Sequence, residues 1–235
     1  MRQWIAGVAF ALIFYGGTMA LALPTVISVA ISDRALQPAS RLWARWYLWC
    51  CRRILGIRMA VRGAVPQGDV IVAFKHQSAF ETIATLTLFD RPAVVMKEEL
   101  RHIPIWGWIA ARHGSIFVQR QAGASALRHM LRQARRSAAS GRPIVIFPEG
   151  TRVAPGQVAP IRAGLYALAS GVRLPVVPVA LDAGKYWQKG LAGKHPGIVT
   201  LAFQPEISPT LPRKAFEEAV QIAINADPVQ VEVRK

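Results

Sequence analysis

Apolar positions along the chain follow two different spacings, and their alternation predicts the fold class. Short apolar runs rich in β-branched residues indicate buried strands, and they lie at 69–74, 93–97, 115–120, 143–148, 174–181 and 198–203. Segments with helical spacing separate them, at about 79–89, 104–112, 123–139, 161–170 and 212–225. Strands that are apolar on both faces and alternate with helices are typical of an α/β sheet with helices on both sides. We therefore predict one α/β domain over residues 61–235, built on a mostly parallel mixed sheet covered by helices.

The first sixty residues have a different pattern, which predicts a helical membrane anchor. No charged residue occurs between Gln3 and Ser32. A helix of that length is about 45 Å long, whereas the hydrocarbon layer of a bilayer is about 30 Å thick. Gly16-Gly17 and Pro24 interrupt the run, which favours a kinked or re-entrant segment. A cleaved secretory signal is the alternative, because residues 20–22 resemble a cleavage site.

Arginine and tryptophan follow the apolar run and predict how the anchor is oriented. Basic residues are enriched on the cytoplasmic flank of membrane segments, and this flank carries Arg34, Arg41, Arg45, Arg52 and Arg53. The tryptophans among them favour a helix that lies in the bilayer interface, although an amphipathic helix docked on the domain has the same pattern. We predict an anchor with an interfacial helix over residues 1–60, in the inner (cytoplasmic) membrane, with the α/β domain on the cytoplasmic side.

Net charge narrows the class of partner. The chain has 29 Lys and Arg against 13 Asp and Glu, a net charge of +16, which predicts anionic partners. Because 52% of the residues are apolar, and no nucleic-acid-binding motif occurs, we expect an anionic membrane surface and no nucleic acid. The arginine-rich helix at 123–139 is either a solvated face or is attracted to acidic headgroups or an acidic carrier. Cys50 and Cys51 are neighbours, so no disulfide framework is expected.

His76 and Glu81, just after the strand at 69–74, are the first candidates for catalysis. Ser78 and Glu81 match the S-x-x-E capping box, which by itself explains both as the start of a helix. Residues five apart on a helix do not face each other, so His76 meets Glu81 only from the turn before the helix. There the carboxylate fixes the tautomer of the imidazole, and His76 is a candidate general base. No G-x-S-x-G motif occurs, which suggests that the substrate brings its own hydroxyl.

A second motif, IFPEGTR at 146–152, is more specific. A buried strand runs straight into a turn in which Gly150 permits tight backbone geometry. Arg152 presents a fork of donors suited to phosphate, and Glu149 can pair with an arginine or with the hydroxyls of a polar headgroup. A strand-end turn with a surface ion pair is the alternative.

Four blocks, taken in order, carry a resemblance to a known family. They are KHQSAFE (75–81), GSIFVQR (114–120), FPEGTR (147–152) and LPVVPVAL (174–181). In this order they resemble the glycerolipid acyltransferase family, in particular its 1-acyl-sn-glycerol-3-phosphate acyltransferases. The resemblance covers residues 70–182 or so, and the preceding anchor fits the family too.

The resemblance implies roles for the block residues. His76 falls on the histidine of the family's H-x4-D pair, the general base, and Glu81 falls on its acidic partner. The residues that bind and orient the glycerophosphate fall on Arg120, Glu149, Gly150 and Arg152. Two positions depart from the family, because Lys75 stands where asparagine is frequent and Glu81 replaces aspartate. The longer carboxylate still reaches the imidazole if the backbone lies slightly farther away.

The implied reaction transfers an acyl chain from acyl-CoA or an acyl-carrier protein to the sn-2 hydroxyl of 1-acyl-glycerol-3-phosphate, giving phosphatidic acid. No cofactor and no metal are expected, since the histidines and acidic residues show no metal-ligand spacing. One alternative is an acyltransferase of the same family that acts on another lysolipid or on glycerol-3-phosphate. A second is a non-catalytic, membrane-anchored lipid-binding protein.

Overall fold

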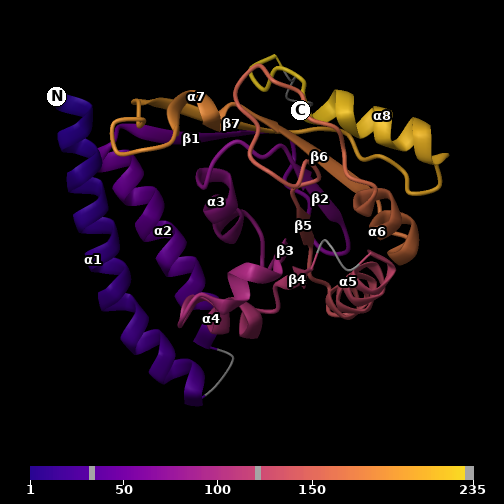
Figure 1. The fold of residues 1–235 in the computed structure, drawn as a ribbon, viewed down its shortest axis with the longest axis horizontal. Coiled ribbons are helices and arrows are strands. Elements are labelled where there is room, and N and C mark those ends of the chain that lie inside the picture. The colour runs from indigo at the N-terminus through magenta and orange to yellow at the C-terminus, as the bar shows by residue number, and fades with distance from the viewer. Residues whose placement is uncertain (32–34, 120–122, 231–235) are drawn as a thin grey trace.

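A seven-stranded sheet forms the centre of the molecule (Figure 1). The computed structural model describes residues 1–31, 35–119 and 123–230. The strands are β1 (Ile57–Arg62), β2 (Ile71–Phe74), β3 (Ala93–Lys97), β4 (Ile116–Val118), β5 (Ile144–Ile146), β6 (Val176–Leu181) and β7 (Gly197–Phe203). They lie in the order β1-β7-β6-β2-β5-β3-β4, and the neighbours are parallel except for β6 and β7. The predicted α/β class and mostly parallel mixed sheet are confirmed.

Helices cover both faces of the sheet, which explains why the strands are apolar throughout. The helices are α1 (Arg2–Ile31), α2 (Leu36–Ile54), α3 (Phe80–Leu88), α4 (Trp106–His113), α5 (Gly123–Ala138), α6 (Gly164–Val172), α7 (Ala183–Tyr186) and α8 (Arg213–Ile224), with a 3₁₀ turn η2 (Glu98–His102). Along β2, Ile71 and Ala73 join a buried cluster with α5, α6 and α8, whereas Val72 and Phe74 join a cluster with α1, α2 and α3. Successive strand residues are therefore buried on alternate faces.

The sequence pattern does not predict β1. This strand lies at one edge of the sheet and pairs in parallel with β7, from Ile57 opposite Gly197 to Arg62 opposite Ala202. Arg58 and Arg62 suit an edge strand. In the sequence, however, they look like a continuation of the arginine and apolar residues of α2, so the strand is not recognised. Because β1 begins at Ile57, the strand crosses the domain boundary predicted at residue 60.

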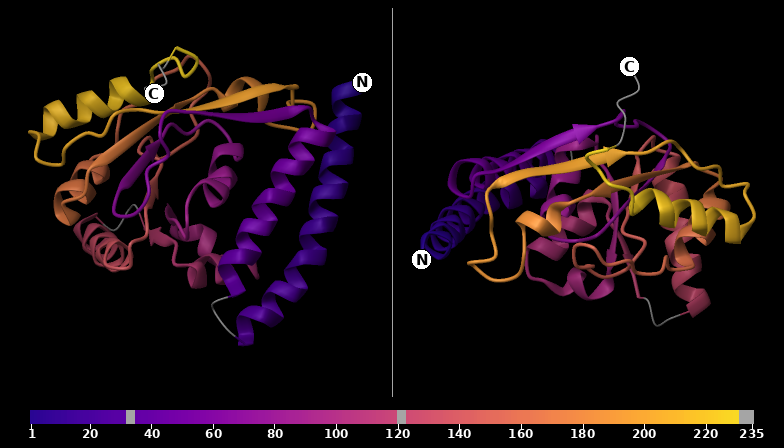
Figure 2. Two further views of the ribbon diagram at one scale, coloured as in Figure 1. Left: turned by 180° about the vertical axis from the view of Figure 1, so that it is seen from behind. Right: turned by 90° about the horizontal axis from the view of Figure 1, so that it is seen from above.

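α1 and α2 run side by side in opposite directions (Figures 1 and 2). α1 continues through Gly16-Gly17 and Pro24, so the predicted interruption is absent. Gly17 instead permits close packing, since a Cβ there would lie 2.5 Å from the ring of Trp46 on α2. By length and composition alone, Arg2–Ile27 suffices for a membrane span, with a mean hydropathy of 1.9.

His113, the last residue of α4, has a perturbed pKa. Arg142 donates to the carbonyl oxygens of His113 at 2.6 Å and of Arg91 at 2.8 Å, which brings both arginines to this helix end. Burial of the imidazole lowers the pKa of His113 from 6.5 to about 4, and the positive charges of the two arginines add to the effect. His113 is therefore neutral in the folded protein near neutral pH.

We expect this histidine to make stability fall as the pH is lowered. Between pH 6.5 and about 4, the unfolded chain binds a proton that the folded chain does not bind. The free energy of unfolding then decreases by up to about 1.4 kcal/mol for each pH unit lowered. Urea unfolding in detergent, at about pH 7 and about pH 5, measures the change. His113→Gln should remove most of the pH dependence of the unfolding free energy that is due to this histidine. Equal pH slopes in the two proteins would contradict this prediction.

Candidate active site

The predicted site residues gather at the edge of the sheet where β2 and β5 end. These strands are neighbours, with Ala73 opposite Ile146, so the segments that follow them meet. Val153 donates its backbone N–H to the carbonyl oxygen of His76 at 2.8 Å, and Glu149 Oε2 accepts the backbone N–H of His76 at 2.8 Å. The carboxyl edge of parallel strands is where α/β folds usually bind ligands. The first and third sequence blocks therefore form one site.

His76 and Glu81 are in hydrogen-bond contact, with Nδ1 of the imidazole 3.0 Å from Oε1 of the carboxylate. α3 begins at Phe80, so His76 approaches from the turn before the helix, as the spacing predicts. Glu81 is completely buried, whereas 18% of the His76 side chain is exposed. The pair thus has a buried acid and an accessible imidazole.

Three further donors hold the Glu81 carboxylate in place. The backbone N–H groups of Gln77 and Ser78 donate to Oε1 at 2.7 and 2.6 Å, and the Ser78 hydroxyl donates to Oε2. The bond from the Ser78 N–H to Glu81 is the returning bond of a capping box, and the Ser78 hydroxyl oxygen accepts the N–H of Phe80 at 3.0 Å. The helix-start and dyad interpretations are therefore both correct in geometry, and glutamate reaches the imidazole despite the departure from aspartate.

The ring of His76 is oriented for proton transfer through Nε2. When Nδ1 donates its hydrogen to the carboxylate, Nε2 carries the lone pair. Phe147 packs against the imidazole, with ring centroids 4.4 Å apart. A carboxylate in the position of Glu81 can stabilise the imidazolium that would form if Nε2 accepted a proton. The arrangement is suited to a general base.

Glu149 lies inside the protein, a placement that does not fit direct contact with a glycerophosphate. Its side chain has no exposed area. Its oxygens accept hydrogen bonds from the Lys75 ammonium at 3.3 Å and from the backbone N–H of His76 at 2.8 Å. Both carboxylate oxygens are thus used within the protein. Glu149 fixes the turn that carries His76.

Lys75 is the site residue whose contacts sequence reasoning missed. Its buried ammonium also donates to the carbonyl oxygen of Gln157 at 3.3 Å and to the side-chain oxygen of Asn225. The three contacts join β2, the segment after β5 and the end of α8. The one sequence signal was a lysine where the family frequently has asparagine.

Gly150 and Arg152 lie in the turn after β5. Gly150 has φ +74°, a conformation that favours glycine, and its N–H donates to the carbonyl oxygen of Phe147 at 3.0 Å. Arg152 is exposed. Burial lowers the pKa of Lys194, and the positive charge of Arg152 lowers it further. The predicted site residue Arg120 lies outside the described residues.

Comparison with known proteins identifies the family. The family model described as Acyltransferase matches residues 57–182. This chain belongs to the acyltransferase family. The 1-acyl-sn-glycerol-3-phosphate acyltransferase of Pseudomonas aeruginosa is 36% identical over 165 residues, which are 69% of this chain and 64% of that protein. The mouse 1-acyl-sn-glycerol-3-phosphate acyltransferase alpha is 27% identical over 206 residues, 85% of this chain and 72% of that protein.

Two further acyltransferases show how widely the likeness extends. The lyso-ornithine lipid O-acyltransferase of Rhodobacter capsulatus is 32% identical over 160 residues, 65% of this chain and 57% of that protein. The crystal structure of the 1-acyl-sn-glycerophosphate (LPA) acyltransferase PlsC from Thermotoga maritima matches with a TM-score of 0.69 over 95% of this chain and 96% of that chain, at 23% identity. The fold is shared with the T. maritima structure. The sequence match to the P. aeruginosa protein spans less than two thirds of that protein.

Proposed function

We propose that this chain transfers an acyl chain from an acyl thioester to the sn-2 hydroxyl of 1-acyl-glycerol-3-phosphate, giving phosphatidic acid. The observation that carries the proposal is the 3.0 Å contact between His76 and the buried carboxylate of Glu81. Family membership and the named activities of the P. aeruginosa and mouse relatives support this reaction.

In the proposed mechanism, both substrates react in one complex. His76 Nε2 removes the proton of the sn-2 hydroxyl, and the oxygen attacks the carbonyl carbon of the thioester. The tetrahedral intermediate then breaks its C–S bond, and the leaving thiolate takes the proton from the imidazolium. Cys50 and Cys51 are fully buried in α2, so the nucleophile is the substrate hydroxyl and no acyl-enzyme forms.

Arg152 is the proposed phosphate-binding residue, with Arg120. We expect Arg152→Ala to raise the KM for lysophosphatidate roughly tenfold, the loss of about 1.4 kcal/mol of binding, with little change in kcat. Arg152→Lys should lie between, because lysine keeps the charge but not the planar fork of donors. Steady-state kinetics with a water-soluble, short-chain lysophosphatidate measures both constants. An unchanged KM in Arg152→Ala would remove this residue from the phosphate site.

The acceptor is tested with a panel of hydroxyl compounds. Purified protein in detergent receives acyl-CoA with lysophosphatidate, glycerol-3-phosphate or a lyso-ornithine lipid, the acceptor named for the R. capsulatus relative. Release of free thiol with lysophosphatidate alone supports the proposal, and release with another acceptor alone contradicts it. No release with any acceptor, together with retained lipid binding, would favour the non-catalytic lipid-binding protein.

We also propose where the reaction occurs and what it requires. The apolar helix α1 and the arginines after it favour attachment to the inner membrane, with the α/β domain on the cytoplasmic side and against an anionic lipid surface. Acyl-CoA or an acyl-carrier protein supplies the thioester, and no cofactor takes part. Among the described residues, no three His, Cys, Asp or Glu side chains converge as metal ligands would.

A further inference from the structure

An exposed apolar patch lies between β3 and β4, outside the proposed site. Ile103, Ile105 and Trp108 are 44%, 53% and 40% exposed, and Pro104 between them is exposed as well. Single apolar residues on a surface need no explanation, but a contiguous patch marks an interaction site. These residues belong to the segment that runs from η2 into α4.

The backbone of this segment is strained at its most exposed isoleucine. Ile105 has φ +63° and ψ −57°, and Trp106 donates its N–H to the carbonyl oxygen of Pro104 at 2.6 Å. These features define the rare, strained form of the γ-turn, and a β-branched residue at positive φ is an outlier. Gly107 lets the turn close, since a Cβ there would lie 2.1 Å from the carbonyl oxygen of Arg101. Strain of this kind concentrates at functional positions.

Two arginines belong to the same segment as the patch. Arg112 lies over the ring of Trp108 at 5.2 Å, and Arg101 lies over Phe117 at 5.7 Å while also pairing with Glu98 at 3.6 Å. Between Leu100 and Val118 the chain has no acidic residue, and its arginines are Arg101 and Arg112. Tryptophan, aliphatic side chains and arginine together suit the headgroup region of an anionic bilayer.

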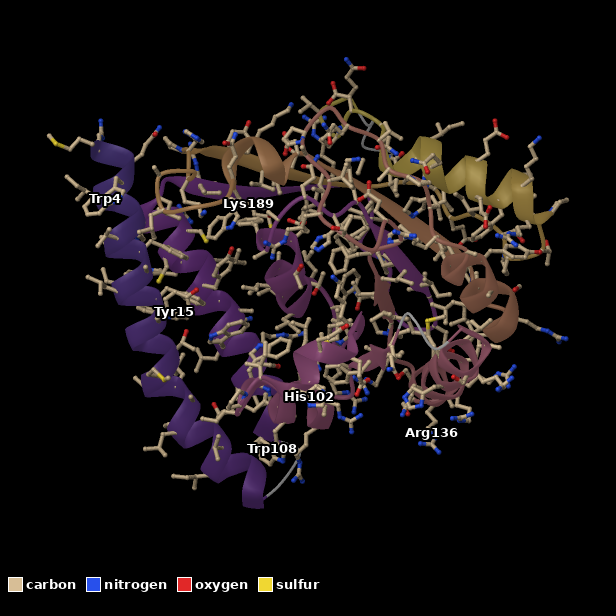
Figure 3. The ribbon with its side chains drawn as sticks, in the orientation of Figure 1. Trp4, Tyr15, His102, Trp108, Arg136 and Lys189 are labelled. Atoms are coloured by element: carbon tan, nitrogen blue, oxygen red, sulfur yellow. The ribbon has the colours of Figure 1, made fainter. Side chains whose placement is uncertain are left out.

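The patch lies beside the predicted membrane anchor. α4 packs against α2, next to the part of α2 that is closest to its connection with α1 (Figures 1 and 2). Trp108 lies toward this same end of the molecule (Figure 3). The neighbouring half of α1 also exposes apolar side chains, with Met19 at 67%, Leu23 at 67% and Ile27 at 54%. The anchor and the patch therefore present apolar side chains at one end of the protein.

We propose that Ile103, Ile105 and Trp108 form a second membrane contact, which inserts into the headgroup region of an anionic bilayer. This inference rests on the membrane attachment proposed above. The α1–α2 pair alone leaves the tilt of the domain against the bilayer undetermined, whereas a second contact from another element restricts that tilt. It thereby holds the edge that carries His76 at a constant height above the lipid.

A fluorescent probe at Ile105 tests the contact without relying on acyl transfer. The full chain with Ile105→Cys is labelled with a polarity-sensitive fluorophore and mixed with vesicles of phosphatidylcholine and phosphatidylglycerol. The native Cys50 and Cys51 are buried, and burial raises the pKa of both thiols, so they compete poorly for the label. The matched control is Ile222→Cys, an isoleucine that is 67% exposed on α8, a helix that lies far from α1 (Figure 1).

We expect the probe at Ile105 to brighten, to shift to shorter wavelength and to be quenched by spin-labelled lipid, while the probe at Ile222 stays unchanged. Ile103→Cys should behave like Ile105→Cys, which protects the test against a folding defect at the strained turn. Vesicle flotation of the unlabelled chain reports on attachment itself. Flotation with an unchanged Ile105 probe would overturn the second contact, and failure to float would overturn the attachment. A shift that depends on protein concentration without vesicles would assign the patch to a second copy of the chain instead.

Discussion

His76→Ala is expected to reduce acyl transfer by about 10²–10⁴-fold, the usual contribution of a general base. The imidazole is the accessible member of a buried, fully hydrogen-bonded pair, and its Nε2 is free to accept the proton of the lipid hydroxyl when Nδ1 is bonded to Glu81. Thiol release from acyl-CoA in detergent measures the rate. Circular dichroism should show an unchanged fold, because removal of the half-buried ring leaves the backbone contacts of residue 76 in place.

The matched control is His102→Ala, since His102 is an exposed histidine in η2. Its variant should keep the wild-type rate. Glu81→Gln offers a second check, because the amide cannot stabilise the imidazolium as the carboxylate does. A wild-type rate in His76→Ala would end the general-base proposal. A loss in His102→Ala as large as that in His76→Ala would show that the assay responds to any histidine.

Glu149→Ala is expected to lower the free energy of unfolding by about 3–5 kcal/mol, because it leaves the Lys75 ammonium buried without its counter-charge. The side chains of Lys75 and Glu149 are only 7% and 0% exposed. The backbone N–H of His76 also loses its acceptor. The midpoint and slope of urea unfolding measure the loss, which is a large share of the about 5–15 kcal/mol that stabilises an ordinary domain.

Two comparisons separate the buried charge from other effects of truncation. Lys75→Met with Glu149→Leu removes both charges and fills the space, so it should be more stable than Glu149→Ala alone. Glu217→Ala breaks an exposed pair with Arg213, 2.9 Å long, and should cost below about 1 kcal/mol. A similar small loss in Glu149→Ala would mean that water reaches the ammonium and that the pair does not hold the His76 turn.

Burial on both faces made most of the sheet predictable. Residues such as Ile71 to Phe74 are apolar at every position because helices cover each side. β1 lacks this signal, since an edge strand tolerates arginine and its partner β7 lies far along the chain. In the sequence alone, the glycines of α1 indicate an interruption of the helix. Glycine is equally suited to close helix packing, which is what Gly17 permits against Trp46.

Local contacts of the site were predictable, and distant ones were not. His76 and Glu81 are five positions apart, so a turn followed by a helix decides whether they meet. The contact of Lys75 with Asn225 spans 150 residues and depends on where α8 lies against the sheet. Glu149 is similar, because its burial follows from the pairing of β2 with β5 rather than from its neighbours in sequence.

The bond between Lys75 and Asn225 also sets an order of events during synthesis of the protein. The ribosome makes α1 and Lys75 before Asn225, which follows Lys75 by 150 residues. Until α8 and Asn225 have left the exit tunnel, the Lys75 ammonium lacks one of its acceptors and the turn that carries His76 is incompletely supported. The turn that carries His76 therefore gains its full set of contacts only after α8 has been made, long after α1.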